Sequence, residues 1–114
     1  MGEQGLDDPH VIAQLHRAQG GDAHAQEMMA DLFYWGARGV PRDHGAARHW
    51  FMQAAEQGRV PSLIAVAGMF LKGEGGPADN MTAVRLYQEA QEQGSPAASN
   101  GLGYAYFYGQ GGLP

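Results

Sequence analysis

Apolar residues recur at helical spacing in six short segments of this chain, and turn residues separate the segments. In the first segment, Val11, Ile12, Leu15 and Ala18 share one helical face. Asp8 and Pro9 precede them, as an N-cap and a first helical residue commonly do. Applied along the chain, this pattern predicts no strand, and it predicts helices at about 8–20, 23–35, 44–57, 61–72, 80–93 and 96–108.

The segments repeat with a period of 36 residues. Gly58 and Gly94 each close a Glu-Gln-Gly run, and Asp43 and Asp79 show the same offset. A fixed period of this size indicates a solenoid, in which each unit buries its apolar face by stacking on the next. We therefore expect an all-α solenoid of antiparallel helix pairs, with about two and a half to three repeats. The expected units are 22–58, 59–94 and the incomplete 95–114.

Small, apolar and aromatic positions alternate in the same order in every unit. The residues that recur in the first helices should face the core, because spacings of four place them on one helical side. Small residues there let the neighbouring helix approach closely, and larger ones fill the gaps between layers. The small positions are Ala25, Ser62, Ala98, Ala30, Ala67 and Gly103, and the larger ones are Met29, Val66, Leu102, Phe33, Phe70 and Tyr106. In the second helices, the pairs Ala47/Ala83, Phe51/Tyr87 and Ala54/Ala90 should play the same part.

Composition narrows the function classes. The 114 residues suit one domain, and the pattern suggests a piece of a longer solenoid that begins and ends in mid-repeat. The net charge of −5 and the absence of a basic run argue against nucleic acid as a partner. The longest apolar stretch, 63–71, is too short to cross a membrane, so we expect no membrane contact by this segment. The absence of cysteine excludes disulfides and leaves the redox compartment open.

Several segments resemble the Sel-one-like repeat, a relative of the tetratricopeptide repeat. Its pattern is roughly LGxxYxxGxGVxxDxxxAxxWxxxAAxxG, and the segment GARGVPRDHGAARHWFMQAAEQG is similar to it. The resemblance covers about 22–114, with Gly76 and Gly112 standing where Val is usual. It implies an interaction scaffold whose partners are other proteins.

A narrower resemblance concerns the Hrd-type adaptors of endoplasmic reticulum degradation ubiquitin-ligase complexes. The turn GARGVPRDH and the later segments DNMTAVRLY and GLGYAYFYGQG are similar to the repeats of their luminal region. This resemblance implies a scaffold in the endoplasmic reticulum lumen that recruits glycoprotein substrates and lectins. The alternative is a bacterial or cytosolic repeat protein that binds a signalling or host partner.

Chemical motifs give little support to a third class, a repeat-fold enzyme. No Ser lies in GxSxG or SxxK, and the histidines form neither HExxH nor a same-face ligand set. We therefore expect no catalysis, metal or cofactor. Asn80-Met81-Thr82 is an N-glycosylation acceptor pattern at an exposed helix start, and a chance match to so short a pattern stays open.

Two surfaces are candidates for binding. In tetratricopeptide-like solenoids, the first helices of the units line the concave face. The residues that this places on the face are His24, Glu27, Asp31, Trp35, Ile64, Lys72, Asn100, Tyr104 and Tyr108. They serve either as partner contacts or merely as a cover for the neighbouring repeat. At the last helix, Leu102, Tyr106 and Phe107 would lack a covering helix, which predicts self-association.

Overall fold

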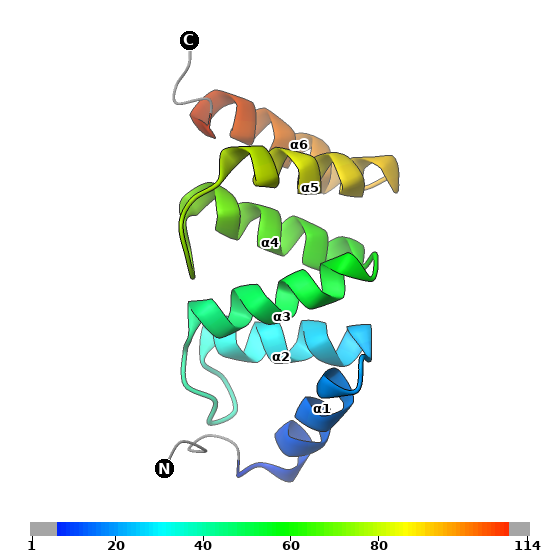
Figure 1. Ribbon diagram of the computed structural model, residues 1–114, viewed down its shortest axis with the longest axis vertical. Helices are drawn as coiled ribbons and strands as arrows, with labels where there is room; N and C mark the ends of the chain where they lie inside the picture. The colour runs from blue at the N-terminus through cyan, green and yellow to red at the C-terminus, as the bar shows by residue number, and fades with distance from the viewer. Residues whose placement is uncertain (1–6, 110–114) are drawn as a thin grey trace.

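The computed structural model describes residues 7–109, with side chains through residue 107, as a stack of α-helices without strands in this range (Figure 1). The helices are α1 (Pro9–Gln19), α2 (Ala23–Trp35), α3 (His44–Glu56), α4 (Val60–Lys72), α5 (Asn80–Glu92) and α6 (Pro96–Tyr104). A π-helical segment, η1 (Ala105–Gly109), continues α6. The six predicted helices and the all-α solenoid are confirmed. The exception is residues 105–109, where the predicted α-helix widens into a π-helix.

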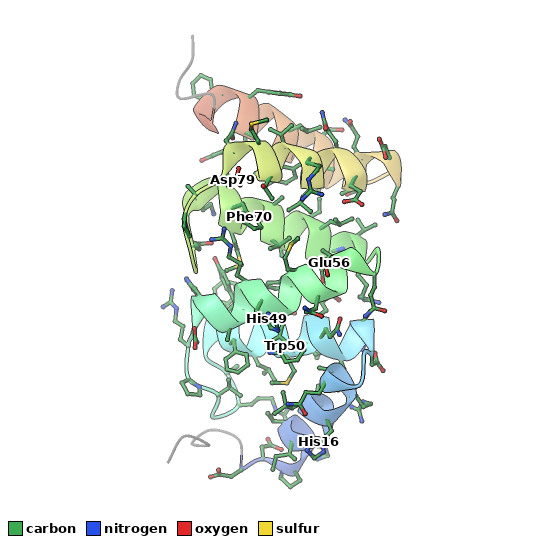
Figure 2. The ribbon with its side chains drawn as sticks, in the orientation of Figure 1. His16, His49, Trp50, Glu56, Phe70 and Asp79 are labelled. Carbon is green, nitrogen blue, oxygen red and sulfur yellow. The ribbon has the colours of Figure 1, made fainter. Side chains whose placement is uncertain are left out.

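The helix starts follow the predicted capping chemistry. The Asp8 carboxylate accepts a hydrogen bond from the backbone N–H of His10 at 2.8 Å, which satisfies a donor that the helix itself leaves unpaired. Asp43 and Asp79 accept equivalent bonds at the starts of α3 and α5. At both of these helix starts, the aspartate also connects back to the preceding helix. The backbone N–H groups of Asp43 and Asp79 donate to the backbone carbonyls of Phe33 and Phe70, each at 2.8 Å. Figure 2 labels Asp79 and Phe70 at the second of these junctions.

Successive helices pack against one another, and α1 and α6 lie at opposite ends of the stack (Figure 1). The stack measures 49 × 26 × 17 Å, which is the elongated form that one-dimensional stacking of repeats produces. α2 and α3 form the first helix pair, and α4 and α5 form the second. α1 packs on α2 as α3 packs on α4, so it occupies the position of a second helix in a preceding unit.

Most of the predicted repeating positions lie in the core. Ala25, Ser62 and Ala98 are buried, and so are Phe51 and Tyr87 in the second helices. Phe33 and Phe70 are only partly buried.

The two expectations for the last helix have different outcomes at different residues. Leu102 is 7% exposed and faces the core beside α5, as its repeating position predicts, so the expectation that it lacks a covering helix was wrong. Tyr106, which was also a predicted core position, is 47% exposed, and Gly103 lies in open space, so both core predictions were wrong.

Arg48 ties α3 to the turn of the next unit. Its guanidinium donates to the backbone carbonyls of Glu74 and Pro77, at 3.2 and 2.9 Å, and lies 3.8 Å from the ring centroid of Phe70. This cation–π contact and the two hydrogen bonds fix the position of the glycine-rich turn at 73–79. The turn carries Glu74, which reaches the candidate site described next.

Candidate partner-binding groove

The first cleft of the candidate site lies between α2 and α4 and has a volume of about 270 Å³. Phe51 of α3 lies between these helices and lines the cleft. The ring of Trp35 stands at the cleft with 70% of its surface exposed. The other lining residues are Asp31, Tyr34, Ile64, Ala65, Gly68, Lys72 and Glu74.

The second cleft lies between α4 and α6 and has a volume of about 290 Å³. Tyr87 of α5 lines it, and the exposed ring of Tyr104 stands at its far wall. Gly68 and Lys72 line both clefts, so the two volumes adjoin along α4. The remaining lining residues are Leu71, Asn100 and Gly101. We refer to the two clefts together as the groove.

The two clefts are equivalent under the sequence repeat. Phe51 and Tyr87 are 36 residues apart and occupy the same place in their clefts. Six further lining positions match with offsets of 36 or 37 residues, and the pairs are Asp31/Gly68, Tyr34/Leu71, Trp35/Lys72, Ile64/Asn100, Ala65/Gly101 and Gly68/Tyr104. The groove is thus a product of the repeat itself, since stacking like units places like surfaces side by side.

Charged and hydrogen-bonded groups concentrate in the first cleft. The Tyr34 hydroxyl donates to the Glu74 carboxylate, at 3.1 and 3.0 Å from its two oxygens. Burial raises the pKa of Tyr34, and this contact with Glu74 raises it further. The ring of Tyr34 also stacks on His44, with 4.5 Å between ring centroids, and meets Trp35 edge-on at 4.8 Å. Tyr34 therefore joins the next unit's turn to α2.

The Asp31 carboxyl experiences a locally unfavourable environment for its charge. Desolvation raises its pKa above the ordinary aspartate value, and the neighbouring Glu27 carboxylate raises it further. Among the described residues, Asp31 has no ion pair or hydrogen bond that would offset this effect. A cation in the first cleft would favour the ionised form of Asp31.

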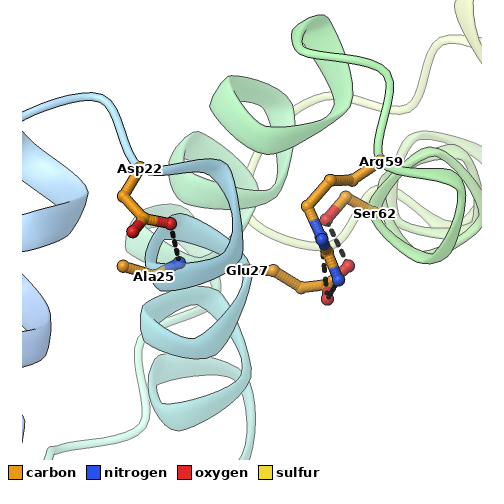
Figure 3. Close-up of polar contacts among 5 residues, drawn as sticks. All are labelled: Asp22, Ala25, Glu27, Arg59 and Ser62. Carbon is orange, nitrogen blue, oxygen red and sulfur yellow. Dashed lines mark hydrogen bonds and ion pairs between the residues drawn. The ribbon is translucent and has the colours of Figure 1, made fainter.

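Glu27 makes a polar contact between the first helices of two units (Figure 3). Its Oε1 accepts hydrogen bonds from Nε and an Nη of Arg59, at 3.2 and 2.9 Å, and its Oε2 accepts from the Ser62 hydroxyl at 2.8 Å. The side chain of Glu27 is only 12% exposed, which strengthens these charge-assisted bonds. The contact thus joins α2 to the beginning of α4, the two helices that flank the first cleft.

The structure brings together most of the residues predicted for the binding face. Asp31, Trp35, Ile64 and Lys72 line the first cleft, while Lys72, Asn100 and Tyr104 line the second. His24 is exposed but lines neither cleft, and Glu27 bonds to Arg59 and Ser62 instead. The side chain of Tyr108 lies outside the described residues.

Sequence reasoning missed eight residues that line the groove, namely Tyr34, Phe51, Ala65, Gly68, Leu71, Glu74, Tyr87 and Gly101. Phe51 and Tyr87 were correctly predicted as core residues, but each also lines a cleft. The offset of 36 residues between Phe51 and Tyr87 was the available signal, because two aromatic residues at the same position of successive repeats should line equivalent surface clefts. Glu74 gave no such signal, since the position of a side chain in a turn depends on the contacts that hold the turn in place.

Asn80 is the first residue of α5 and is partly buried, not fully exposed as expected. Its side-chain oxygen is buried without a hydrogen-bond partner among the described residues. The Thr82 hydroxyl of the same acceptor pattern donates to the Asp79 carboxylate at 2.7 Å, as part of the helix cap. This bond holds Thr82 in a fixed position two residues after Asn80.

Within residues 7–109, no three His, Asp or Glu side chains gather closely enough to hold a metal ion. Nor does any helix in this range combine the length and the apolar character that a bilayer crossing requires.

Repeated antiparallel helix pairs with a continuous groove define a helical-repeat solenoid. Sel1 repeats are recognised at residues 23–58, 60–95 and 96–114. The chain therefore belongs to the Sel1 repeat family.

Two curated relatives come from Arabidopsis thaliana and are ERAD-associated E3 ubiquitin-protein ligase components. HRD3A is 33% identical over 72 residues, which cover 63% of this chain and 11% of the relative. HRD3B is 31% identical over 109 residues, which cover 95% of this chain and 17% of the relative. The chain thus corresponds to a small part of each of these proteins.

Two solved structures share the fold. A Sel1 repeat protein from Oxalobacter formigenes is 31% identical with a TM-score of 0.73, over 76% of this chain and 25% of that one. A protective antigen of uropathogenic Escherichia coli strains, which displays an SLR fold, is 33% identical with a TM-score of 0.80. The match to this antigen covers 87% of this chain and 21% of that one.

Proposed function

We propose that this chain is a protein-interaction scaffold that holds a segment of a partner protein in the groove. The observation that carries the proposal is the pair of repeat-equivalent clefts, which adjoin along α4 and present the exposed rings of Trp35 and Tyr104. Amphipathic aromatic side chains are favoured anchors in protein interfaces. The line of two clefts suits an extended segment better than a compact small molecule.

Binding, not catalysis, is the role that the groove supports. Its lining contains no Ser, Thr, Cys or His, so it offers no nucleophile paired with an imidazole base. Asp31 and Glu74 are the carboxylates at the first cleft, and the Tyr34 hydroxyl already bonds to Glu74. Net charge is −5, and this supports protein partners over nucleic acid.

We further propose that the scaffold acts as an adaptor in endoplasmic reticulum-associated degradation. The similarity to HRD3A and HRD3B supports this role, and so does the acceptor pattern at Asn80. In such a role the repeats would lie in the lumen and recruit substrates or lectins to a ubiquitin ligase. The alternative, a bacterial or cytosolic Sel1 repeat protein that binds a signalling or host partner, is supported by the likeness to the two bacterial structures.

A blocked groove tests the scaffold role. Gly68 lines both clefts, so the side chain introduced by Gly68→Arg would fill the space where they meet. Gln93→Arg adds the same charge at an exposed site outside the groove and serves as the matched control. In a peptide display selection, we expect specific peptides to bind the parent chain and the control but not Gly68→Arg. Equal binding by all three proteins would contradict the proposal that the groove binds the partner segment.

Expression through a secretory pathway tests the compartment. An adaptor of the lumen should gain a glycan at Asn80, seen as a mass that endoglycosidase removes and that Asn80→Gln abolishes. Efficient secretory expression without the added mass would argue for the bacterial or cytosolic alternative.

A further inference from the structure

The two clefts share their geometry but differ in charge. Three equivalent pairs carry much of this difference: Asp31 corresponds to Gly68, Trp35 to Lys72, and Ile64 to Asn100. The first cleft also carries Glu74, which has no counterpart among the residues that line the second cleft. The groove therefore has a direction along the stack, acidic at α2 and basic and polar towards α6.

The first cleft suits a basic side chain. It carries the carboxylates of Asp31 and Glu74, while Lys72 lies at the wall that it shares with the second cleft. The exposed Trp35 ring offers the face over which a guanidinium or ammonium group is attracted. Since Asp31 has no ion pair with another described residue, an incoming cation would give its carboxylate a partner.

The second cleft suits a carboxylate. Lys72 is the one charged residue that lines it, and it forms no ion pair within the described part of the chain. Asn100 and Tyr87 also line the cleft, and they add an amide and a hydroxyl group that can form hydrogen bonds beside this ammonium. Replacement of the apolar Ile64 by Asn100 at the equivalent position makes the second cleft the more polar of the two.

The separation of the clefts sets the spacing of the ligand. The helices α4 and α6, which form the second cleft, are in direct contact, and packed helices lie about 8–10 Å apart. An extended chain advances about 3.3–3.6 Å per residue, so neighbouring clefts are about three residues apart along a bound segment.

We propose that the groove recognises an extended peptide segment with an Arg or Lys in the first cleft and an Asp or Glu about three residues away in the second. This inference rests on the proposed function and adds the charge pattern of the ligand to it. The opposite charges at the two ends of the motif match the opposite charges of the two clefts. This match attracts the peptide and also fixes which of its residues lies in which cleft.

The test uses synthetic peptides of defined sequence. The probes carry Arg-Ala-Ala-Glu, or the reverse order Glu-Ala-Ala-Arg, between Gly-Ser flanks, because the chain direction in the groove is open to either. Control peptides replace Arg, Glu or both by Gln. Binding is followed by NMR titration of the whole chain and of the variants Asp31→Asn and Lys72→Gln, whose exposed positions on helices α2 and α4 leave the core unchanged.

We expect one of the two probe orders to bind at least about threefold more tightly than its Arg-to-Gln control, as a cation–π contact with an exposed ion pair provides. Asp31→Asn should weaken that preference without changing the affinity of the Gln control, and Lys72→Gln should do the same for the Glu position. If both charged probes bind no better than the all-Gln peptide, or if Asp31→Asn leaves the preference undiminished, the charge pattern is wrong. Equally tight binding of charged and uncharged peptides, blocked in both cases by Gly68→Arg, would overturn this inference and leave the scaffold role standing.

Discussion

The ring of Tyr87 lies where a side chain at position 101 would begin. A Cβ atom built on Gly101 would be 2.2 Å from Cε1 of this ring, far inside van der Waals contact. Tyr87 comes from α5 and Gly101 from α6, and both line the second cleft. In the first cleft, Ala65 faces Phe51 at the equivalent positions. The absence of a side chain at 101 thus lets the larger aromatic residue lie under the groove.

We predict that Gly101→Ala destabilises the fold although alanine is the better helix former. Overpacking against Tyr87 should lower the free energy of unfolding by about 1–3 kcal/mol, partly offset by about 1 kcal/mol of helix propensity. Gly103→Ala is the matched control on the same helix, because a Cβ there meets nothing within 4 Å. The control should gain about 0.5–1 kcal/mol. Urea denaturation of the two variants decides the matter, and equal gains in both would show that Tyr87 moves aside freely.

The turn glycine Gly75 gives a second prediction. Its φ is +77°, and a Cβ there would be 2.3 Å from the backbone oxygen of His44. Gly94 shares the left-handed conformation, at φ +86°, but has nothing within 4 Å. Both Gly→Ala changes should be unfavourable through the backbone, by about 1–2 kcal/mol. Only Gly75→Ala should lose about 1 kcal/mol or more beyond this through the clash, measured as the difference in thermal unfolding.

The bonds from Glu27 to Arg59 and Ser62 give a third prediction (Figure 3). Because these residues join two units, a double-mutant cycle of Glu27→Gln and Arg59→Met should reveal a coupling of about 0.5–3 kcal/mol in unfolding free energy. The same cycle between Glu56, which is exposed, and Arg59 is the control and should show no coupling. Strictly additive losses in the first cycle would mean that the pair does not help to join α2 to α4.

Self-association remains a prediction and now rests on fewer residues. Leu102 is buried within the chain, but Phe107 and Tyr106 are 69% and 47% exposed. Fully burying a Phe side chain contributes about 1.5–3 kcal/mol, so pairing with a second copy is favourable at high concentration. Light scattering on a sizing column should detect a concentration-dependent dimer that Phe107→Glu weakens and that Met81→Glu, at another exposed site, does not. A monomer at every concentration would contradict the prediction.

Helix boundaries and caps could be read from the sequence because they depend on local chemistry. Asp43 and Asp79, for example, cap their helices through side chains and backbone groups three residues away. Part of the groove face also followed, since the repeat period and helical spacing together locate residues such as Trp35 and Tyr104.

Long-range contacts could not be read in the same way. The bond between Tyr34 and Glu74 joins residues 40 positions apart and depends on a turn that Arg48 holds in place. Partial burial of Asn80 and the exposure of Tyr106 likewise depend on how neighbouring helices pack. Charge differences between the clefts were present in the sequence, but they gained meaning only when the structure showed which positions are equivalent.

The two tryptophans allow the most direct test of the claim that the groove binds a partner segment. Trp35 lines the first cleft, whereas Trp50 packs against the core clusters outside both clefts. Their indole N–H signals can be followed separately by NMR during titration with a peptide selected by display on this chain. The groove account predicts a saturable shift of the Trp35 signal with little change at Trp50, lost in Gly68→Arg. Binding of the peptide that leaves the Trp35 signal unmoved would contradict the account.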